Sequence, residues 1–298
     1  MNNKTSDSFD LGIIPRLILF VILPNAVVTP LRIFAEAVIE GKESAPEFIT
    51  VGFLIYGICA KLVFGFGYVL FGYRLPVKNT VLRGFAYIML ILCSSYLPNI
   101  LAMAGGDGEI ISESLTAGIV AVDVISYLLE GLVLGLLMKR YDVKAPGAEH
   151  RKGANHKLIC LVNGVLFAAL NVLADLVIGA ADSSWRLCAI IKVTPQRETV
   201  FFLVFTAFMF IAGALLPIWY RYCLPAEASN RETVLFGIKL AAVIWLPNVL
   251  IMAFFGTPAL LTAAYGGVYI FMFAASILVY KKLDTSKNAG CLSEEHPV

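Results

Sequence analysis

Four polar residues recur at helical spacing in the first long apolar stretch of the chain. Asn25, Thr29, Arg32 and Glu36 are four, three and four residues apart, so a helix would place them on one face. A charged side chain at the centre of a membrane helix costs about 2.5–3.5 kcal/mol, which makes each one a candidate functional group. Arg32 and Glu36 are expected to form an ion pair, because residues four apart are neighbours on a helix surface.

The same pattern returns 139 residues later, where Asn171 corresponds to Arg32 and Asp175 to Glu36. We expect Glu36 and Asp175 to converge on one cation or protonated substrate, since each half of the chain then supplies a carboxylate from the same place. Glu36 would stay a fixed charge beside Arg32, whereas Asp175 has only Asn171 beside it and would exchange a proton. The alternative is that both carboxylates are structural, with Asp175 capping a helix or reaching the membrane surface.

The tripeptide Leu-Pro-Asn occurs three times and ends at Asn25, Asn99 and Asn248. Proline frees a backbone carbonyl one turn earlier in a helix, and the adjacent asparagine offers both a donor and an acceptor. Helices broken at matching places in two halves indicate the binding site of repeat transporters. Asn99 and Asn248 are therefore expected to line a site between the halves; the alternative is a structural kink copied by duplication.

Three charged residues, Lys61, Asp123 and Glu130, correspond to uncharged residues in the second half. Asp123 and Glu130 are seven residues apart and would share one face of a helix. Lys61 is expected to pair with one of them, which would remove most of the cost of burying both charges. Together with Arg32, these residues are candidates for coupling or gating. If they form only ion pairs, they fix helix register instead.

An internal repeat positions these residues. Residues 46–104 align without a gap with residues 195–253, with 14 identities in 59 positions. The matched proline and asparagine residues are not explained by shared hydrophobicity. The alignment extends to both ends of each copy, with an offset of 139 residues near its start and 142 near its end. We therefore expect two tandem copies of one unit.

Composition places the repeat in a membrane. The mean hydropathy is +0.82, and only 15% of the residues are charged, against about a quarter in soluble domains. Eight apolar stretches are long enough to cross about 30 Å of hydrocarbon. They lie near residues 16–39, 49–72, 84–105, 115–138, 158–180, 199–221, 236–256 and 259–280. The sequence thus predicts an all-α polytopic membrane protein, with eight transmembrane helices as two four-helix repeats in parallel orientation.

The expected organisation is a first membrane repeat over residues 11–142, a basic linker over 143–156, a second membrane repeat over 157–284 and a disordered tail over 285–298. Seventeen Lys and Arg residues fall in the segments assigned to the inner side and four in the outer loops. This asymmetry predicts a protein of the cytoplasmic membrane with both termini in the cytoplasm.

Several classes of function are disfavoured. The chain has no P-loop and no His-Glu-x-x-His motif, its three histidines are assigned to loops or the tail, and its six cysteines are not spaced for zinc or for a disulfide framework. We therefore expect no cofactor, no metal site and no enzymatic activity. Membrane lipids are the expected partners of the basic linker, and no nucleic acid is expected.

The favoured function is a permease for a small molecule or ion, which a proton gradient would drive if the buried carboxylates titrate. Its substrate site is expected to contain a set of carboxylates and asparagines from both halves, namely Glu36, Asp175, Asn99, Asn248 and Asn171. The alternative is a non-transporting membrane subunit, such as an immunity, sensor or accessory protein that binds a membrane-complex partner.

The topology can be tested by labelling single cysteines in a variant that lacks the six native ones. In intact cells, Lys144→Cys and Ser293→Cys should be shielded from an impermeant thiol reagent, because both positions are expected in the cytoplasm. Asp107→Cys should react, because its loop is expected outside. Strong labelling at position 144 from outside would show that the orientation is wrong.

Overall fold

The computed structural model describes residues 12–34, 47–96, 117–139, 156–190, 193–224, 228–254 and 257–292. Within these ranges the chain is helical, and no β-strand occurs among them. This is the expected result for a chain in hydrocarbon, since a helix satisfies its backbone hydrogen bonds within its own segment. Glu36 and Asn99 lie outside the described residues, and so do the predictions that depend on them.

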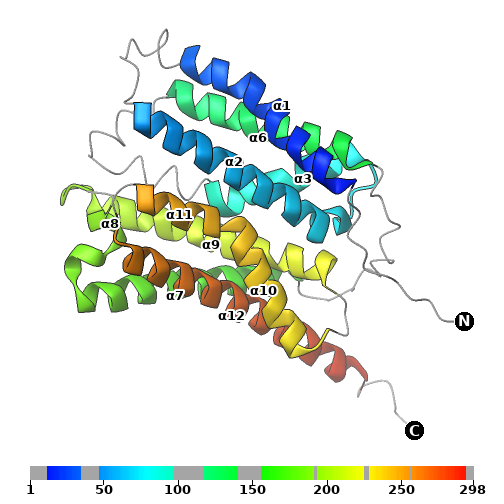
Figure 1. Cartoon of the computed structure of the whole chain (residues 1–298). Coiled ribbons are helices and arrows are strands. Elements are labelled where there is room, and N and C mark those ends of the chain that lie inside the picture. Colours follow the sequence, from blue (N-terminus) through cyan, green and yellow to red (C-terminus); the bar gives the residue numbers. More distant parts are fainter. Residues whose placement is uncertain are drawn as a thin grey trace, which may run out of the picture.

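The first half forms one group of neighbouring helices (Figure 1). Its elements are α1 (Ile13–Phe34), α2 (Glu47–Leu70), the 3₁₀ turn η2 (Gly72–Arg74), α3 (Thr80–Ile91), the π-helical turn η3 (Leu92–Tyr96) and α6 (Ala117–Leu137). Helix α6 packs against both α1 and α3, and α1 also packs against α2.

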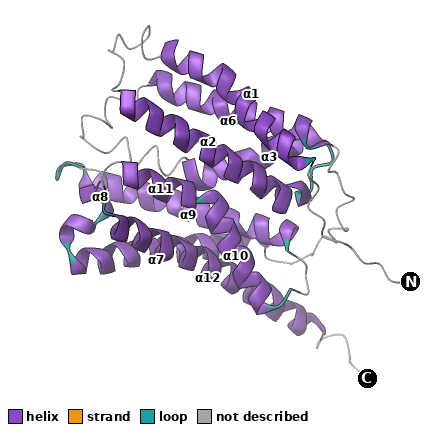
Figure 2. Cartoon of the chain, in the orientation of Figure 1, coloured by secondary structure: helices purple, strands orange, loops and turns teal. Residues whose placement is uncertain are grey.

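The second half forms the other group, in which almost every described residue is helical (Figure 2). Its elements are α7 (His156–Ala181), η5 (Ser183–Trp185), α8 (Leu187–Ile190), α9 (Glu198–Cys223), α10 (Asn230–Ile244), α11 (Leu246–Phe254) and α12 (Ala259–Leu292). Helix α7 packs against α9 and α12, and α10 packs against α12. The two groups meet where α2 contacts α10 and α11, and where α9 contacts η3.

Five of these helices are long and apolar enough to cross a membrane: α1, α6, α7, α9 and α12. The segments Leu54–Leu70 in α2 and Thr80–Tyr96 across α3 and η3 are shorter apolar helices. Large apolar side chains cover the outside of the long helices, for example Val177 and Phe271, each 62% exposed. An apolar exterior around apolar helices of this length indicates a multi-pass membrane protein.

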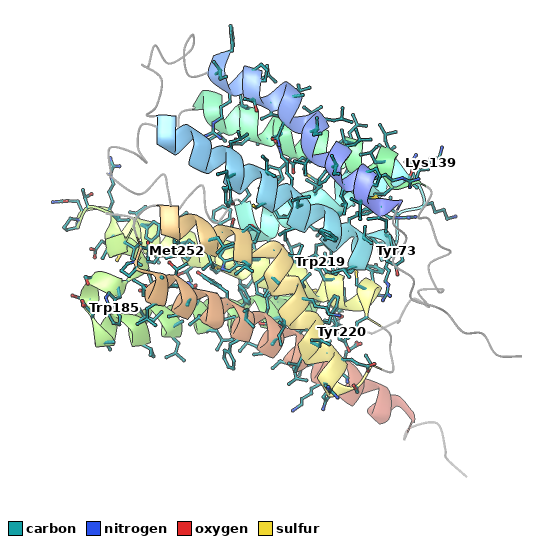
Figure 3. All side chains as sticks on the ribbon, viewed as in Figure 1. Tyr73, Lys139, Trp185, Trp219, Tyr220 and Met252 are labelled. Atoms are coloured by element: carbon teal, nitrogen blue, oxygen red, sulfur yellow. The ribbon has the colours of Figure 1, made fainter. Side chains whose placement is uncertain are left out.

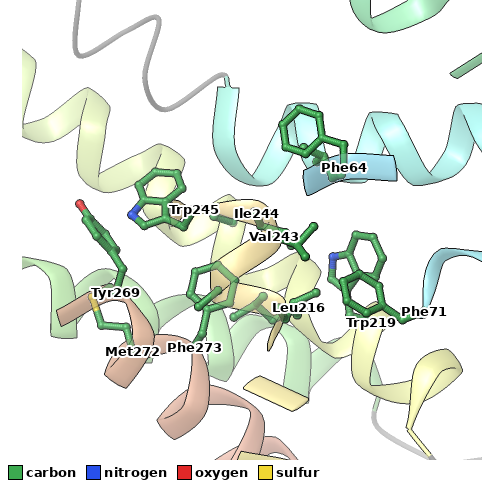
Figure 4. Close-up of a cluster of buried hydrophobic side chains, with 14 of the residues drawn as sticks. Phe64, Phe71, Leu216, Trp219, Val243, Ile244, Trp245, Tyr269, Met272 and Phe273 are labelled. Carbon is green, nitrogen blue, oxygen red and sulfur yellow. The ribbon is translucent and has the colours of Figure 1, made fainter. Parts of the chain in front are cut away.

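Aromatic side chains join the two groups at their centre (Figure 4). The Trp219 ring contacts Tyr87 and Phe71 edge to face, with centroids 5.6 and 5.5 Å away. Phe71 also meets Phe236 at 5.9 Å. The buried Tyr87 hydroxyl donates to the Phe64 carbonyl oxygen at 2.7 Å, so its one polar atom is satisfied. Such pairs stabilise by about 0.5–1.5 kcal/mol beyond the area that they bury.

Trp219 lies in the middle of the molecule, whereas Trp185 and Lys139 lie at opposite ends of the helices (Figure 3). The sequence assigns Trp185 to an outer loop and Lys139 to the inner side. Which side of the membrane each of these ends faces stays a prediction.

One helix breaks at a Leu-Pro-Asn motif. Helix α10 ends at Ile244, and α11 begins at Leu246, the residue before Pro247. Trp245 lies between the two helices. Proline has no N–H to donate, and its ring crowds the carbonyl four residues earlier, so Pro247 interrupts the backbone hydrogen bonds of the helix before it. In the first half, α3 passes into the π-helical turn η3, which ends just before the matching motif.

Two predicted boundaries are wrong. His156 is not part of the linker but the first residue of α7, where its Nδ1 lies 2.9 Å from the Tyr280 hydroxyl of α12. The tail predicted as disordered from residue 285 is helical as far as Leu292, because α12 continues into it. Extending an existing helix needs no new nucleation, and no proline interrupts these residues.

Helices α3 and α6 approach each other through glycines. A Cβ added at Gly84 would overlap the Gly131 carbonyl oxygen and would lie 2.9 Å from Gly135 Cα. The Gly-x-x-x-Gly pair of α6 therefore lets the two backbones touch, as in closely packed membrane helices.

Gly84→Ala should destabilise the protein by about 1–3 kcal/mol, because a methyl group inserted here forces the two backbones apart. Gly57→Ala is the matched control, since a Cβ at this position of α2 meets nothing within 4 Å. Thermal unfolding in detergent should show a lower midpoint for Gly84→Ala and an unchanged or higher one for Gly57→Ala. Equal midpoints would show that α3 and α6 can separate freely.

Candidate functional site

A buried ion pair lies at the centre of the first half. Lys61 of α2 and Glu130 of α6 are 6% and 3% exposed, and Lys61 Nζ lies 3.4 Å from Glu130 Oε1. Lys61 also donates to Asn25 Oδ1 on α1, and Ser126 Oγ donates to Glu130 Oε1 at 3.0 Å. We call Asn25, Lys61, Ser126 and Glu130 the Lys61 cluster. Of the two pairings that the sequence allows for Lys61, the structure has the one with Glu130.

Glu130 is incompletely satisfied. Within the described part of the chain, its Oε2 is buried and has no hydrogen-bond partner. A carboxylate oxygen without a donor in a low-dielectric interior is costly, because the desolvation of the charged group is not compensated there. This oxygen is therefore the natural place for a proton or for a donor from a ligand.

Arg32 joins a second cluster. Its Nη1 lies 3.7 Å from Asp123 Oδ1, and the Tyr96 hydroxyl donates to Asp123 Oδ2. The Tyr96 ring packs on Tyr127 with centroids 4.8 Å apart. We call Arg32, Tyr96, Asp123 and Tyr127 the Asp123 cluster. Glu36, which the sequence predicts as the partner of Arg32, lies outside the described residues. Its pairing with Arg32 therefore stays a prediction.

Asn248 faces the space between the halves, as the sequence predicts for this residue. The Tyr56 hydroxyl donates to its Oδ1 at 3.5 Å, and its Nδ2 donates to Ser95 Oγ. Tyr56 and Ser95 both belong to the first half, so the amide of Asn248 links α11 to α2 and to η3. Its counterpart Asn99 lies outside the described residues.

The expectation that Asp175 has no cationic partner is wrong. Arg186 Nε lies 3.1 Å from Asp175 Oδ2, and the Leu187 backbone N–H donates to Asp175 Oδ1 at 3.0 Å. Asn171, one turn earlier, accepts a hydrogen bond from the Tyr269 hydroxyl at 3.4 Å. Arg186 comes from the segment that follows α7 and folds back over its end, so helical spacing could not reveal the pair.

Asp175 and Asn171 open into a pocket of about 30 Å³ between α7, α9 and α12. We call this space the Asp175 pocket. Its lining consists of Asn171, Ala174, Asp175, Arg186, Leu187, Cys188, Glu198, Phe201, Phe202, Phe205, Tyr265, Val268 and Tyr269. The hydrogen bond to Asp175 raises the pKa of Arg186, so the guanidinium stays charged at the pocket.

The three sets of residues do not form one site in this conformation. The lining of the Asp175 pocket includes no member of the Lys61 cluster or of the Asp123 cluster. Asn248 is tied to Tyr56 and Ser95 rather than to Asp175 or Asn171. The predicted convergence of Asp175 with Asn248 on one ligand is therefore not seen, and the convergence with Glu36 lies outside the described residues.

Sequence patterns missed several polar partners, namely Tyr56, Tyr96, Arg186, Glu198, Tyr265 and Tyr269. One signal could have found two of the aromatic residues, Tyr96 and Tyr269. Tyr96 and Trp245 each immediately precede a Leu-Pro-Asn motif, and each packs on a tyrosine of the last helix of its half. For Arg186 no comparable signal exists, because its position depends on the path of a loop.

No metal centre emerges from the described residues. Among them, no group of three or more His, Cys, Asp or Glu side chains is arranged to hold a metal ion. Five cysteines in this part of the chain are free, including the buried Cys188 and Cys223.

Comparisons with protein-family models, with curated proteins and with solved structures found no match to this chain. No relative therefore indicates a substrate or a partner. What bears on function is the chemistry of the Lys61 cluster, the Asp123 cluster and the Asp175 pocket.

Removing one member of the Lys61–Glu130 pair should cost about 3–5 kcal/mol, because the other charge stays buried without a partner. Lys61→Met should therefore lower the stability strongly, and Lys61→Met combined with Glu130→Leu should recover most of the loss. Lys157→Met on the exposed start of α7 is the control for removing a lysine. Denaturant unfolding in detergent measures all four proteins; a double variant as unstable as Lys61→Met would show that the pair is not the coupled unit.

Proposed function

We propose that this protein is a permease for a small molecule or ion, coupled to protons through Glu130. It would cross the cytoplasmic membrane eight times, as two tandem four-helix repeats in parallel orientation, with both termini in the cytoplasm. The observation that carries the proposal is the buried Lys61–Glu130 pair with one carboxylate oxygen left without a donor among the described residues. Ionisable groups inside a membrane protein are costly and mark ion pathways and proton relays.

The pattern of helix packing supports the repeat. In the alignment, α1 corresponds to α7, α2 to α9, α3 with η3 to α10 with α11, and α6 to α12. Three main contacts within the first half then have counterparts: α1 with α6 and α7 with α12, α3 with α6 and α10 with α12, α1 with α2 and α7 with α9. The contacts between the halves also correspond, since α2 meets α11 and α9 meets η3.

Matched side chains support it as well. The Tyr96–Tyr127 and Trp245–Tyr269 ring pairs occupy aligned positions, with centroid distances of 4.8 and 4.7 Å. Arg74 Nη1 donates to the Cys223 carbonyl oxygen at 2.8 Å, although the two residues are 149 positions apart and align with each other. A residue that contacts its own counterpart is expected next to a two-fold axis between equivalent units.

The first-half charges fit a coupling role. A proton on Glu130 would cancel its charge and remove the attraction that holds Lys61 in place, while Asn25 would still accept from the lysine. The Lys61 contact bridges α2 to α6, and the Asn25 contact bridges α2 to α1. Protonation would therefore weaken one helix contact and keep another, which is the change that an alternating-access protein requires of a coupling residue.

A second function has support from a different observation. Three ion pairs that occur among the described residues, Lys61–Glu130, Arg32–Asp123 and Arg186–Asp175, each join one acid to one base. Matched charges in a packed interior are also what a non-transporting membrane subunit would use to fix its helices. The two functions differ in whether Glu130 must change its protonation state.

Vesicles distinguish the two functions. The purified protein is placed in liposomes that contain a pH-sensitive dye, and potassium with valinomycin holds the membrane potential constant. The interior is made acidic, and sodium, choline, tetramethylammonium, glycine or phosphate is then added outside. At least one solute should collapse the gradient in the wild type and fail with Glu130→Gln, because the proton site is lost. The control Lys157→Met should behave as the wild type. Vesicles as tight as protein-free ones for every solute would favour the non-transporting subunit.

A further inference from the structure

The charge of the Asp175 pocket favours a cation. Its described lining contains two carboxylates, Asp175 and Glu198, against one guanidinium, that of Arg186, which leaves one formal negative charge in excess. Asp175 is only 9% exposed, so its charge acts in a medium where water screens little. The excess negative charge would repel an anion, and a neutral solute would leave that charge unbalanced.

The walls of the pocket narrow the class of cation. Three phenylalanines and two tyrosines line it, Phe201, Phe202, Phe205, Tyr265 and Tyr269. Aromatic faces attract organic cations and are used in proteins to recognise alkylated ammonium groups. Hard metal ions instead need several oxygen ligands. The two tyrosine hydroxyls already donate to the Asn171 Oδ1 atom and to the Trp185 carbonyl.

The oxygen atoms of the pocket keep free acceptor capacity. Each oxygen of Asp175 accepts one bond, from Arg186 or from the Leu187 N–H, whereas an ionised carboxylate offers about four lone-pair positions. A primary ammonium or guanidinium group has the several N–H donors that such a site can use. The volume of about 30 Å³ has room for about two water-sized atoms, since one water needs about 10–15 Å³, so a guanidinium group also needs the space that the Arg186 side chain now fills.

The side chain of Arg186 already places a cationic group beside Asp175. This side chain comes from the segment between η5 and α8 rather than from a packed helix, and it is half-buried. In the alignment, Asn171 corresponds to Arg32 of the first half, and Tyr265 corresponds to Asp123. Arg32 and Asp123 also form a guanidinium–carboxylate pair. Both halves thus place a guanidinium beside a carboxylate at the corresponding location, although the pairs come from different elements.

We propose that the Asp175 pocket binds a small organic cation, of the primary ammonium or guanidinium class, in competition with the side chain of Arg186. The cation contacts Asp175 through its N–H groups and the aromatic walls through its charge. The inference rests on the proposed function in taking Asp175 and Asn171 as substrate-binding residues. Binding requires no proton transfer and no membrane gradient, so it can be measured apart from transport.

Binding is tested on the full-length protein in detergent with methylammonium chloride and guanidinium chloride, against sodium chloride at equal ionic strength. The signal is the tryptophan fluorescence of Trp245, whose ring lies 4.7 Å from that of Tyr269 (Figure 4). Trp245→Phe identifies the part of the signal that comes from this residue. Both organic cations should give a saturable change in the wild type, and sodium should not.

Arg186→Ala should bind both cations at least about tenfold more tightly than the wild type, because the internal competitor is gone. The double variant Asp175→Asn, Arg186→Gln should lose the saturable signal; it keeps the two groups neutral, so no charge is left unpaired. Glu232→Gln, an exposed residue at the start of α10, is the control for losing a carboxylate, since glutamine also fits its capping box.

An Arg186→Ala protein that is folded by circular dichroism and shows no saturable response to either cation overturns the inference. So does a response that the double variant retains. Neither outcome decides whether the protein is a proton-coupled permease, because the vesicle experiment tests that proposal separately with other solutes. Saturable binding in detergent with no gradient collapse by any solute would instead keep the pocket and reject the permease.

Discussion

The pairing of Lys61 with Glu130 constrains the packing of the whole first half. Each charge is buried, so each depends on the other for its stability. Because the two residues stand on α2 and α6, and Asn25 adds α1, three helices must keep their register for the charges to remain satisfied. Apolar packing in lipid provides little of this specificity, since lipid tails are as apolar as the helix surfaces.

The second half solves the same problem with different groups. At the positions that align with Lys61, Asp123 and Glu130 it has Phe210, Tyr265 and Met272, so these three positions are aromatic or apolar. Its charges lie at the end of α7, where Arg186 reaches Asp175 from a loop. One half therefore holds its charges between helices and the other at a helix end.

Helical spacing and hydropathy were sufficient to locate the five long apolar helices, because length and apolarity are properties of contiguous residues. They also narrowed the partner of Lys61 to Asp123 or Glu130, and the structure has the pair with Glu130. The Asp175–Arg186 and Arg32–Asp123 pairs could not be predicted in this way. Both depend on which segments lie side by side in space, through a returning loop in one case and through the α1–α6 contact in the other.

The glycine contact between α3 and α6 has a mechanical consequence. Sliding of packed helices normally proceeds through changes of side-chain rotamer at their interface, and here the backbones of Gly84, Gly131 and Gly135 meet without intervening side chains. Gly237 of α10 lies equally close to the backbone of Ala274 in α12. Such backbone contacts resist sliding within the α3–α6 pair and within the α10–α12 pair. The interruption at Trp245 divides α10 from α11, so the direction of α11 is not fixed by the close contact of Gly237 with α12.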